Sequence, residues 1–185
     1  VYGKSVEQVT DEIIGELKGA EKTGCVVVLV GLSGTGKGTT MARLAKLPNI
    51  VGVKDATQDL ARPINTRIAI GSDFCQMSGE DGTAVPFLAG GGHGCISVTA
   101  NVAPRLCSEM QRAWREKDMD KVMDLQDRLM PLHNAMFCET SPGPVKFAVS
   151  LLGKCSPEAR LPICDISEEN KTKVRDTMVA VGLLN

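Results

Sequence analysis

The pattern of hydrophobic positions predicts four short strands in the first hundred residues. The predicted strands cover residues 25–30, 50–53, 74–78 and 95–98. The first two are continuous apolar runs, which is typical of strands buried on both faces of a parallel sheet. Because helical segments alternate with these strands, we expect an α/β fold with right-handed crossovers.

Apolar residues at helical spacing predict helices before the strands and throughout the carboxyl-terminal part. Ser5 can cap the first helix, and Gln8, three positions on, is its expected capping-box partner. The segment around Pro63 is expected to be a loop. The other predicted helices cover residues 40–47, 83–88, 104–117, 120–137, 144–152 and 167–181. Their apolar stripes are interpreted as core rather than as contacts to a cofactor.

Composition and charge exclude several classes of partner. The net charge is −1, and aromatic residues make up 3% of the chain, so we expect no nucleic-acid partner. No apolar run reaches the roughly 18 residues that a membrane helix needs, and no signal-peptide pattern is present, so we expect a cytoplasmic chain without a membrane partner. The seven cysteines contain no C-x-x-C pair, which indicates buried thiols rather than disulfides or a metal site.

One glycine-rich segment has the spacing of a phosphate-binding loop. It follows the first predicted strand, and Gly38 stands where Ser or Thr is usual. Backbone amides of such a loop can surround phosphate oxygens, and its lysine adds a positive charge. The segment resembles the loop of nucleoside monophosphate kinases of the adenylate and cytidylate type. Its candidate nucleotide-binding residues are Gly31, Ser33, Gly34, Gly36, Lys37, Gly38 and Thr39.

A lysine marks the end of the second predicted strand. The carboxyl ends of parallel strands face the active site in βα folds, and Lys54 follows four apolar residues, which we expect to desolvate it. Desolvation of a lysine favours the neutral amine, which is a nucleophile toward carbonyl groups. By the same reasoning, Gly79 and the segment around Ile96 are expected near Lys54. The alternative is an ordinary solvated lysine at a strand end.

The motifs around Lys54 match a known enzyme family. From about residue 41 onward the chain resembles dihydrodipicolinate synthase, a pyruvate-dependent class I aldolase on a (β/α)8 barrel. The matching segments are residues 47–57 (LPNIVGVKDAT), 78–81 (SGED), 91–102 (GGHGCISVTANV), 128–133, 144–146 and 182–184.

The resemblance implies a role for each matching residue. Lys54 corresponds to the lysine that forms an imine with pyruvate, whose enamine then attacks an aldehyde. Gly79 corresponds to a glycine that lines the pocket, and Ile96 to a residue whose backbone lies against pyruvate. His93 is interpreted as structural. The covalent imine requires no cofactor and no metal, whereas ATP and magnesium belong only to the phosphate-loop alternative.

The resemblance also implies that part of the site is missing. The family's first half supplies a carboxylate-binding loop, proton-relaying tyrosines and an arginine, but the one tyrosine here is Tyr2. We expect a partial TIM-type barrel with about four parallel strands and a carboxyl-terminal helical bundle, preceded by a phosphate-loop-like strand, loop and helix. The expected parts are residues 1–40, which are foreign to the family, 41–103 from the barrel, and 104–185, which are helical.

Three functions follow from these observations. The first is a Schiff-base lyase of the synthase family, truncated or chimeric, acting on pyruvate and an aldehyde. The second is a phosphate-loop nucleotide-binding protein or a kinase fragment. The third is an inactive fusion fragment. Half a barrel leaves two sheet edges unpaired, so we expect either self-association or a complementing barrel half as partner.

Overall fold

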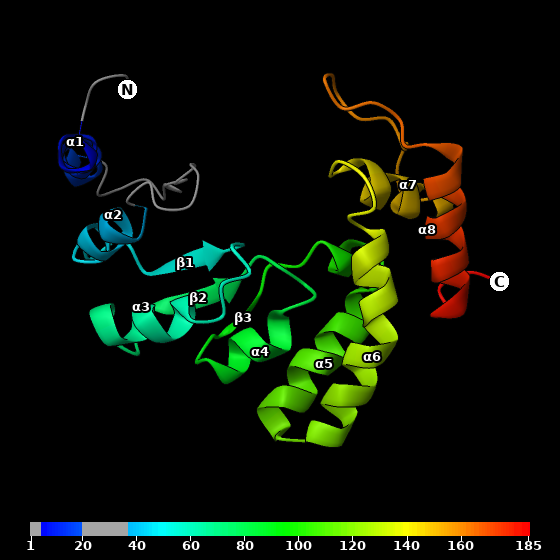
Figure 1. The fold of residues 1–185 in the computed structure, drawn as a ribbon, viewed down its shortest axis with the longest axis horizontal. Helices are drawn as coiled ribbons and strands as arrows, with labels where there is room; N and C mark the ends of the chain where they lie inside the picture. Colours follow the sequence, from blue (N-terminus) through cyan, green and yellow to red (C-terminus); the bar gives the residue numbers. More distant parts are fainter. Residues whose placement is uncertain (1–4, 20–36) are drawn as a thin grey trace.

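A computed structural model describes residues 5–19 and 37–185 (Figure 1). A small parallel sheet lies between two amino-terminal helices and a carboxyl-terminal group of helices. The elements are α1 (Val6–Gly19), α2 (Lys37–Leu44), β1 (Gly52–Asp55), α3 (Arg62–Ile70), β2 (Cys75–Ser78), α4 (Ala84–Ala89), β3 (Gly94–Cys95), η1 (Thr99–Asn101), α5 (Pro104–Glu116), α6 (Met119–Ala135), α7 (Gly143–Leu151) and α8 (Glu168–Ala180).

The sheet has three parallel strands in the order β1-β2-β3. In its register Lys54 is opposite Met77, and Met77 is opposite Gly94. The helices α3 and α4 connect successive strands, as parallel pairing requires. Three of the four predicted strands, and the α/β class, are therefore confirmed. The predicted strand at residues 25–30 lies outside the described residues.

Several predicted boundaries were wrong. The strand β1 covers Gly52–Asp55 rather than 50–53, so Lys54 lies within it, and Val51 is 72% exposed rather than buried. β3 has two residues, because the backbone then turns into the 3-10 helix η1. The expected loop around Pro63 is the helix α3, whose first turn contains this proline. Proline interrupts a helix in its interior but is well suited to its first turn.

The amino-terminal helices agree closely with the sequence pattern. Ser5 N donates to Gln8 Oε1 (2.9 Å) and Gln8 N donates to Ser5 Oγ (3.2 Å), which confirms the predicted capping box. A hydrogen bond between the hydroxyls of Thr10 and Thr40 (3.1 Å) and an ion pair between Arg43 and Asp11 (2.5 Å) join α1 to α2. The helix α2 ends at Leu44, three residues before the predicted end.

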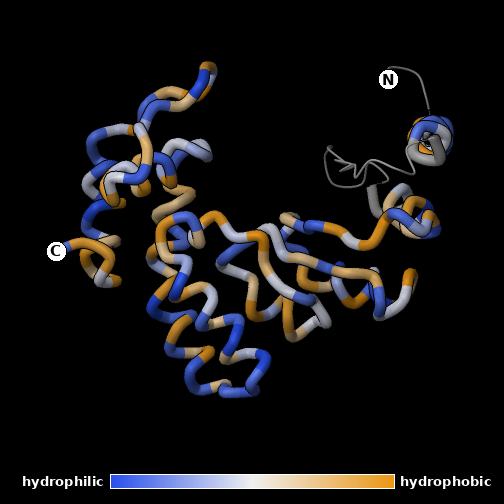
Figure 2. Tube along the Cα trace, turned by 180° about the vertical axis from the view of Figure 1, so that it is seen from behind, coloured by the Kyte–Doolittle hydropathy of each residue, from blue (hydrophilic) through white to orange (hydrophobic). Residues whose placement is uncertain are grey.

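The carboxyl-terminal helices form the main hydrophobic core. The predicted stripes are buried there, and the tip of the α5–α6 hairpin is hydrophilic (Figure 2). Lys117 in the left-handed conformation (φ 63°) ends α5, and the Asp118 side chain caps α6. The side chains that are fully buried in this core include Val122, Leu129, Leu132, Met136, Val174 and Met178.

The prediction of uniformly buried thiols was wrong. The six described cysteines are free; Cys107 is buried, whereas Cys155 and Cys164 are exposed. Both exposed cysteines lie between α7 and α8, where the chain forms no regular element and offers little to cover a side chain. No helix within residues 5–19 and 37–185 is long and apolar enough to cross a membrane.

A buried histidine links this core to the end of the sheet. His133 of α6 is 3% exposed, and its Nδ1 lies 2.7 Å from Thr99 Oγ1 of η1. Its Nε2 is buried without a hydrogen-bond partner among the described residues. Burial lowers the pKa of His133, and the nearby carboxylates of Asp81 and Glu80 oppose this shift only in part. The folded protein therefore holds this imidazole neutral.

This arrangement predicts acid sensitivity. Because the pKa of His133 is lowered on folding, its contribution is complete above the unfolded value of about 6.5 and is lost as the pH falls below it. We expect the free energy of unfolding in urea to fall by about 1 kcal/mol between pH 7.5 and pH 5.5. His133→Gln should flatten this fall, and His93→Gln should keep it. An equal fall in both variants would contradict the assignment.

Candidate functional site

Lys54 and Gly79 are in direct contact at the carboxyl edge of the sheet. A Cβ atom added to Gly79 would lie 2.7 Å from Lys54 Cε and 2.8 Å from Ala56 Cβ. Real Cβ atoms essentially never lie within 3.0 Å of such atoms, so the lysine stem occupies the space that a larger residue would need. Gly79 is also fixed by its backbone, since its N–H donates to Asp55 O (2.7 Å).

Ile96 completes a row of three predicted residues along this edge. Its N–H donates to Ser78 O (2.7 Å), so Ile96 lies beside the end of β2. Side chains alternate between the two faces of a strand, and Ile96 therefore shares the face of Gly94, Met77 and Lys54. The structure thus brings together Lys54, Gly79 and Ile96, although their roles stay predictions.

The expected desolvation of Lys54 is not present. Lys54 is exposed, and so is Val51, three residues before it and immediately ahead of β1. In the part of the chain that the structure describes, β1 pairs on one side only, with β2. The apolar residues near Lys54 shield it only if something covers this face of the sheet. The prediction that the strand alone would shield the amine was therefore wrong.

The turn after Lys54 is held from the opposite face of β1. Asp55 accepts hydrogen bonds from Thr57 N (2.9 Å) and Arg62 Nε (2.8 Å). Burial raises the pKa of the Asp55 carboxyl, but the Thr57 hydrogen bonds and Arg62 together lower it below its ordinary value. Gln58 has a positive φ of 61°, and its Nε2 donates to Glu80 Oε2 (3.2 Å). These contacts tie the ends of β1 and β2 together.

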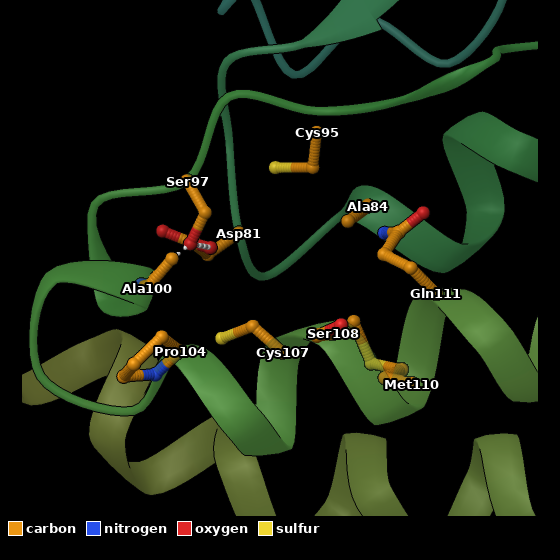
Figure 3. A pocket seen from close by; sticks show the side chains of 10 residues that line it. All are labelled: Asp81, Ala84, Cys95, Ser97, Ala100, Pro104, Cys107, Ser108, Met110 and Gln111. Atoms are coloured by element: carbon orange, nitrogen blue, oxygen red, sulfur yellow. Dashed lines mark hydrogen bonds between the residues drawn. The ribbon is translucent and has the colours of Figure 1, made fainter.

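A cavity of about 220 Å³ lies behind the sheet (Figure 3). Cys95 lines it and follows Gly94, so by strand alternation it lies on the opposite face from Lys54. Burial raises the pKa of Cys95 to about 12 and that of Cys107 to about 11, which leaves both thiols protonated and unreactive. The lining residues are Asp81, Ala84, Cys95, Ser97, Ala100, Pro104, Cys107, Ser108, Met110 and Gln111.

Asp81 organises the wall of this cavity. Its carboxylate accepts hydrogen bonds from the Ser97 hydroxyl, from Val98 N (2.8 Å) and from Thr99 N (3.0 Å). The dashed line in Figure 3 marks the contact with Ser97. No role was predicted for these residues from the sequence. A usable signal was an aspartate after a predicted strand, together with a serine and a threonine at the start of a turn.

The other candidate residues lie apart from the lysine or outside the described residues. His93 Nδ1 accepts a hydrogen bond from Gln76 N (3.1 Å), and His93 N donates one to Gln76 O (2.8 Å). His93 therefore binds the backbone of the neighbouring strand β2. No group of three or more His, Cys, Asp or Glu residues in ranges 5–19 and 37–185 could hold a metal ion.

The phosphate-loop candidates cannot be assembled into a site from the described residues. Gly31, Ser33, Gly34 and Gly36 lie outside them. The backbone of Lys37, Gly38 and Thr39 is described and belongs to the beginning of α2. The predicted resemblance to a kinase loop therefore stays a prediction.

The chain matches one protein family over most of its length. The model of the dihydrodipicolinate synthetase family matches residues 35–181. A 4-hydroxy-tetrahydrodipicolinate synthase of Rhodospirillum centenum is 63% identical over 145 residues, which are 78% of this chain and 50% of that protein. The chain thus spans about half the length of the curated relatives that it matches.

Solved structures show the same relationship. A dihydrodipicolinate synthase from Thermotoga maritima is 33% identical, with a TM-score of 0.83 over 98% of this chain and 63% of that one. The chloride-inhibited dihydrodipicolinate synthase from Acinetobacter baumannii, complexed with pyruvate, is 34% identical. Its TM-score is 0.81, over 95% of this chain and 62% of that one. These neighbours confirm the predicted partial TIM-type barrel for the synthase-like part. The chain belongs to the dihydrodipicolinate synthetase family.

Proposed function

We propose that this chain provides the amine of a Schiff-base lyase that condenses pyruvate with an aldehyde. The observation that supports this most is the contact of Lys54 with Gly79 at the carboxyl edge of the sheet, with Ile96 in the same row. Pyruvate is the molecule bound in the related Acinetobacter baumannii structure. The Rhodospirillum centenum relative is named 4-hydroxy-tetrahydrodipicolinate synthase, and we infer the same class of product here.

The chemistry follows from a neutral primary amine beside a ketone. Lys54 Nζ attacks the carbonyl carbon of pyruvate, the carbinolamine loses water, and a C=N bond forms. The iminium then withdraws electrons from the pyruvate methyl group, which loses a proton and becomes an enamine carbon. This carbon attacks the aldehyde carbonyl, and water finally hydrolyses the imine to release the product and the free lysine. No cofactor is consumed.

The exposed lysine indicates that the site needs a second component. Full efficiency requires that the amine is shielded from water. It also requires a general acid–base group to move protons, which contributes about 10²–10⁴-fold to the rate. We infer that the partner is a complementing amino-terminal barrel half, since the chain spans about half of its relatives. Both outer edges of the described sheet are unpaired, and large apolar side chains are exposed at Val51 (72%), immediately before β1, and at Ile68 (77%) of α3.

Trapping with borohydride tests the proposed amine. Incubation with pyruvate and borohydride should add the reduced pyruvate mass to the peptide that contains Lys54 and not to Lys54→Ala. Gly79→Ala should lower the trapping rate by about tenfold or more, because the added methyl group displaces the lysine stem. Lys154→Ala, at an exposed site, is the matched control. Absence of an adduct in the native chain would refute the proposal for this chain alone.

Binding of the complementary half tests the partner. Sedimentation of this chain with the amino-terminal half of the Rhodospirillum centenum relative should give a one-to-one complex. Val51→Lys should weaken it by about tenfold or more, since a charge is buried at the edge of β1. Val179→Lys, on α8, should leave the affinity unchanged. A homodimer of this chain that excludes the added half would show that self-association is the correct interpretation.

A nucleotide site is a second candidate, favoured by the spacing of Gly31, Gly36 and Lys37. In this proposal the loop amides and Lys37 bind the phosphates of ATP with magnesium. Calorimetric titration should then show that Lys37→Ala weakens binding by about tenfold or more, as expected for a charge-assisted contact. Lys46→Ala, in the turn after α2, is the control. Equal affinities of Lys37→Ala and the native chain for ATP would refute this function.

A further inference from the structure

We propose that Asp81 is a positioning residue, which fixes the backbone at Ile96 against the site around Lys54. This inference rests on the proposed pyruvate chemistry, because it assigns Ile96 to the substrate-facing wall. Asp81 acts from behind the sheet. It is 6% exposed and lines the cavity on the opposite face from Lys54, and the described hydrogen bonds of its carboxylate all run to the segment that follows Ile96.

The first step is the geometry of the Asp81 carboxylate. One oxygen accepts from the Ser97 hydroxyl, and the other accepts from both Val98 N and Thr99 N, at 2.8 and 3.0 Å. Two successive amides directed at one carboxylate oxygen force the backbone out of the strand conformation. The strand β3 therefore ends, and η1 begins, at a position that Asp81 determines.

The second step is that the same turn is fixed from two other directions. The Ser97 hydroxyl, which donates to Asp81, also accepts from Ala100 N (2.8 Å). The Thr99 hydroxyl is hydrogen-bonded to the buried His133 of α6. The hydrophobic core of the helices is thus connected, through Thr99, to the turn that follows Ile96, and this turn has little freedom to move.

The third step connects this turn to the lysine. Ile96 N donates to Ser78 O, so the backbone of Ile96 is held on one side by β2 and on the other by the turn that Asp81 organises. Displacement of this backbone would weaken a contact that pyruvate makes on binding, so it should raise the half-saturating pyruvate concentration rather than lower the rate at saturation. The carboxylate meets all three donors because both of its oxygens accept, whereas an amide has one acceptor oxygen and leaves at least one of the three donors without its partner.

Asp81→Asn tests this assignment in the full chain. The substitution keeps the shape of the side chain, replaces the charged acceptor with a neutral one, and leaves the Ser97 hydroxyl or a backbone N–H without its acceptor. We expect amide hydrogen exchange at Val98 and Thr99 to accelerate by about tenfold or more. In pyruvate trapping at Lys54, the half-saturating pyruvate concentration should rise by about tenfold, while the rate at saturation changes less than about twofold.

The controls separate positioning from general damage. Asp127→Asn, at an exposed position on α6, should change neither quantity. Ser97→Ala removes the hydrogen bonds of the hydroxyl to Asp81 and from Ala100 N but keeps both backbone contacts to Asp81, so it should give an intermediate exchange rate. A merely structural Asp81 would lower the fraction trapped at saturation and leave the half-saturating concentration unchanged, which would overturn the proposal.

The outcomes also distinguish this proposal from the proposed function. If the native chain forms no pyruvate adduct, the lyase function fails for this chain, and exchange at Val98 and Thr99 alone decides whether Asp81 orders the turn. If exchange in Asp81→Asn equals that of the native chain, the positioning role is wrong, whether or not Lys54 forms an adduct.

Discussion

The close approach of Lys54 to Gly79 is the contact on which the account of this site depends. Parallel pairing of β1 with β2 places the lysine stem over a backbone that has no side chain at that point. A second close approach fixes the same strand pair, since a Cβ atom on Gly52 would lie 2.6 Å from Cys75 O. The two glycines at the ends of this pairing therefore set the position of the amine.

Two carboxylates beside this strand pair each hold the backbone of a turn in place. Asp55 holds the turn after β1 through Thr57 and Arg62, and Asp81 holds the turn after β3 through two amides and Ser97. Neither is in the row of Lys54, Gly79 and Ile96. Both fix backbone that approaches this row from the helical side of the sheet. The rigid part of the site is thus contained in this chain, whereas the cover over Lys54 is not contained in its described residues.

The sequence predicts this row of residues because parallel strands align their carboxyl ends, so a residue at each strand end is placed near the others without further information. The exposure of Lys54 is not predictable in this way, because it depends on what packs over β1. The same limit applies to Asp81, whose partners are 16 to 18 residues away in sequence. The helix α3 was missed for a local reason, since Pro63 can either begin a helix or interrupt one.

The helical part was easier to predict than the sheet. Stripes such as Val122, Leu125 and Leu129 repeat over several turns, and a long periodic signal survives an error of one or two residues at each end. A strand of two residues, such as β3, has no period to detect, and its end is set by Asp81 rather than by its own sequence. Short strands whose limits are set by distant side chains are therefore the part that sequence patterns describe least well.

The central claim is that Lys54 Nζ forms a covalent bond with the carbonyl carbon of pyruvate. It is tested most directly by nuclear magnetic resonance of the full chain, labelled with nitrogen-15 at lysine and mixed with pyruvate labelled with carbon-13 at that carbon. We expect one directly bonded carbon–nitrogen pair, which is lost in Lys54→Arg and kept in Lys154→Arg. A spectrum with no such pair, or a pair that survives Lys54→Arg, would contradict it.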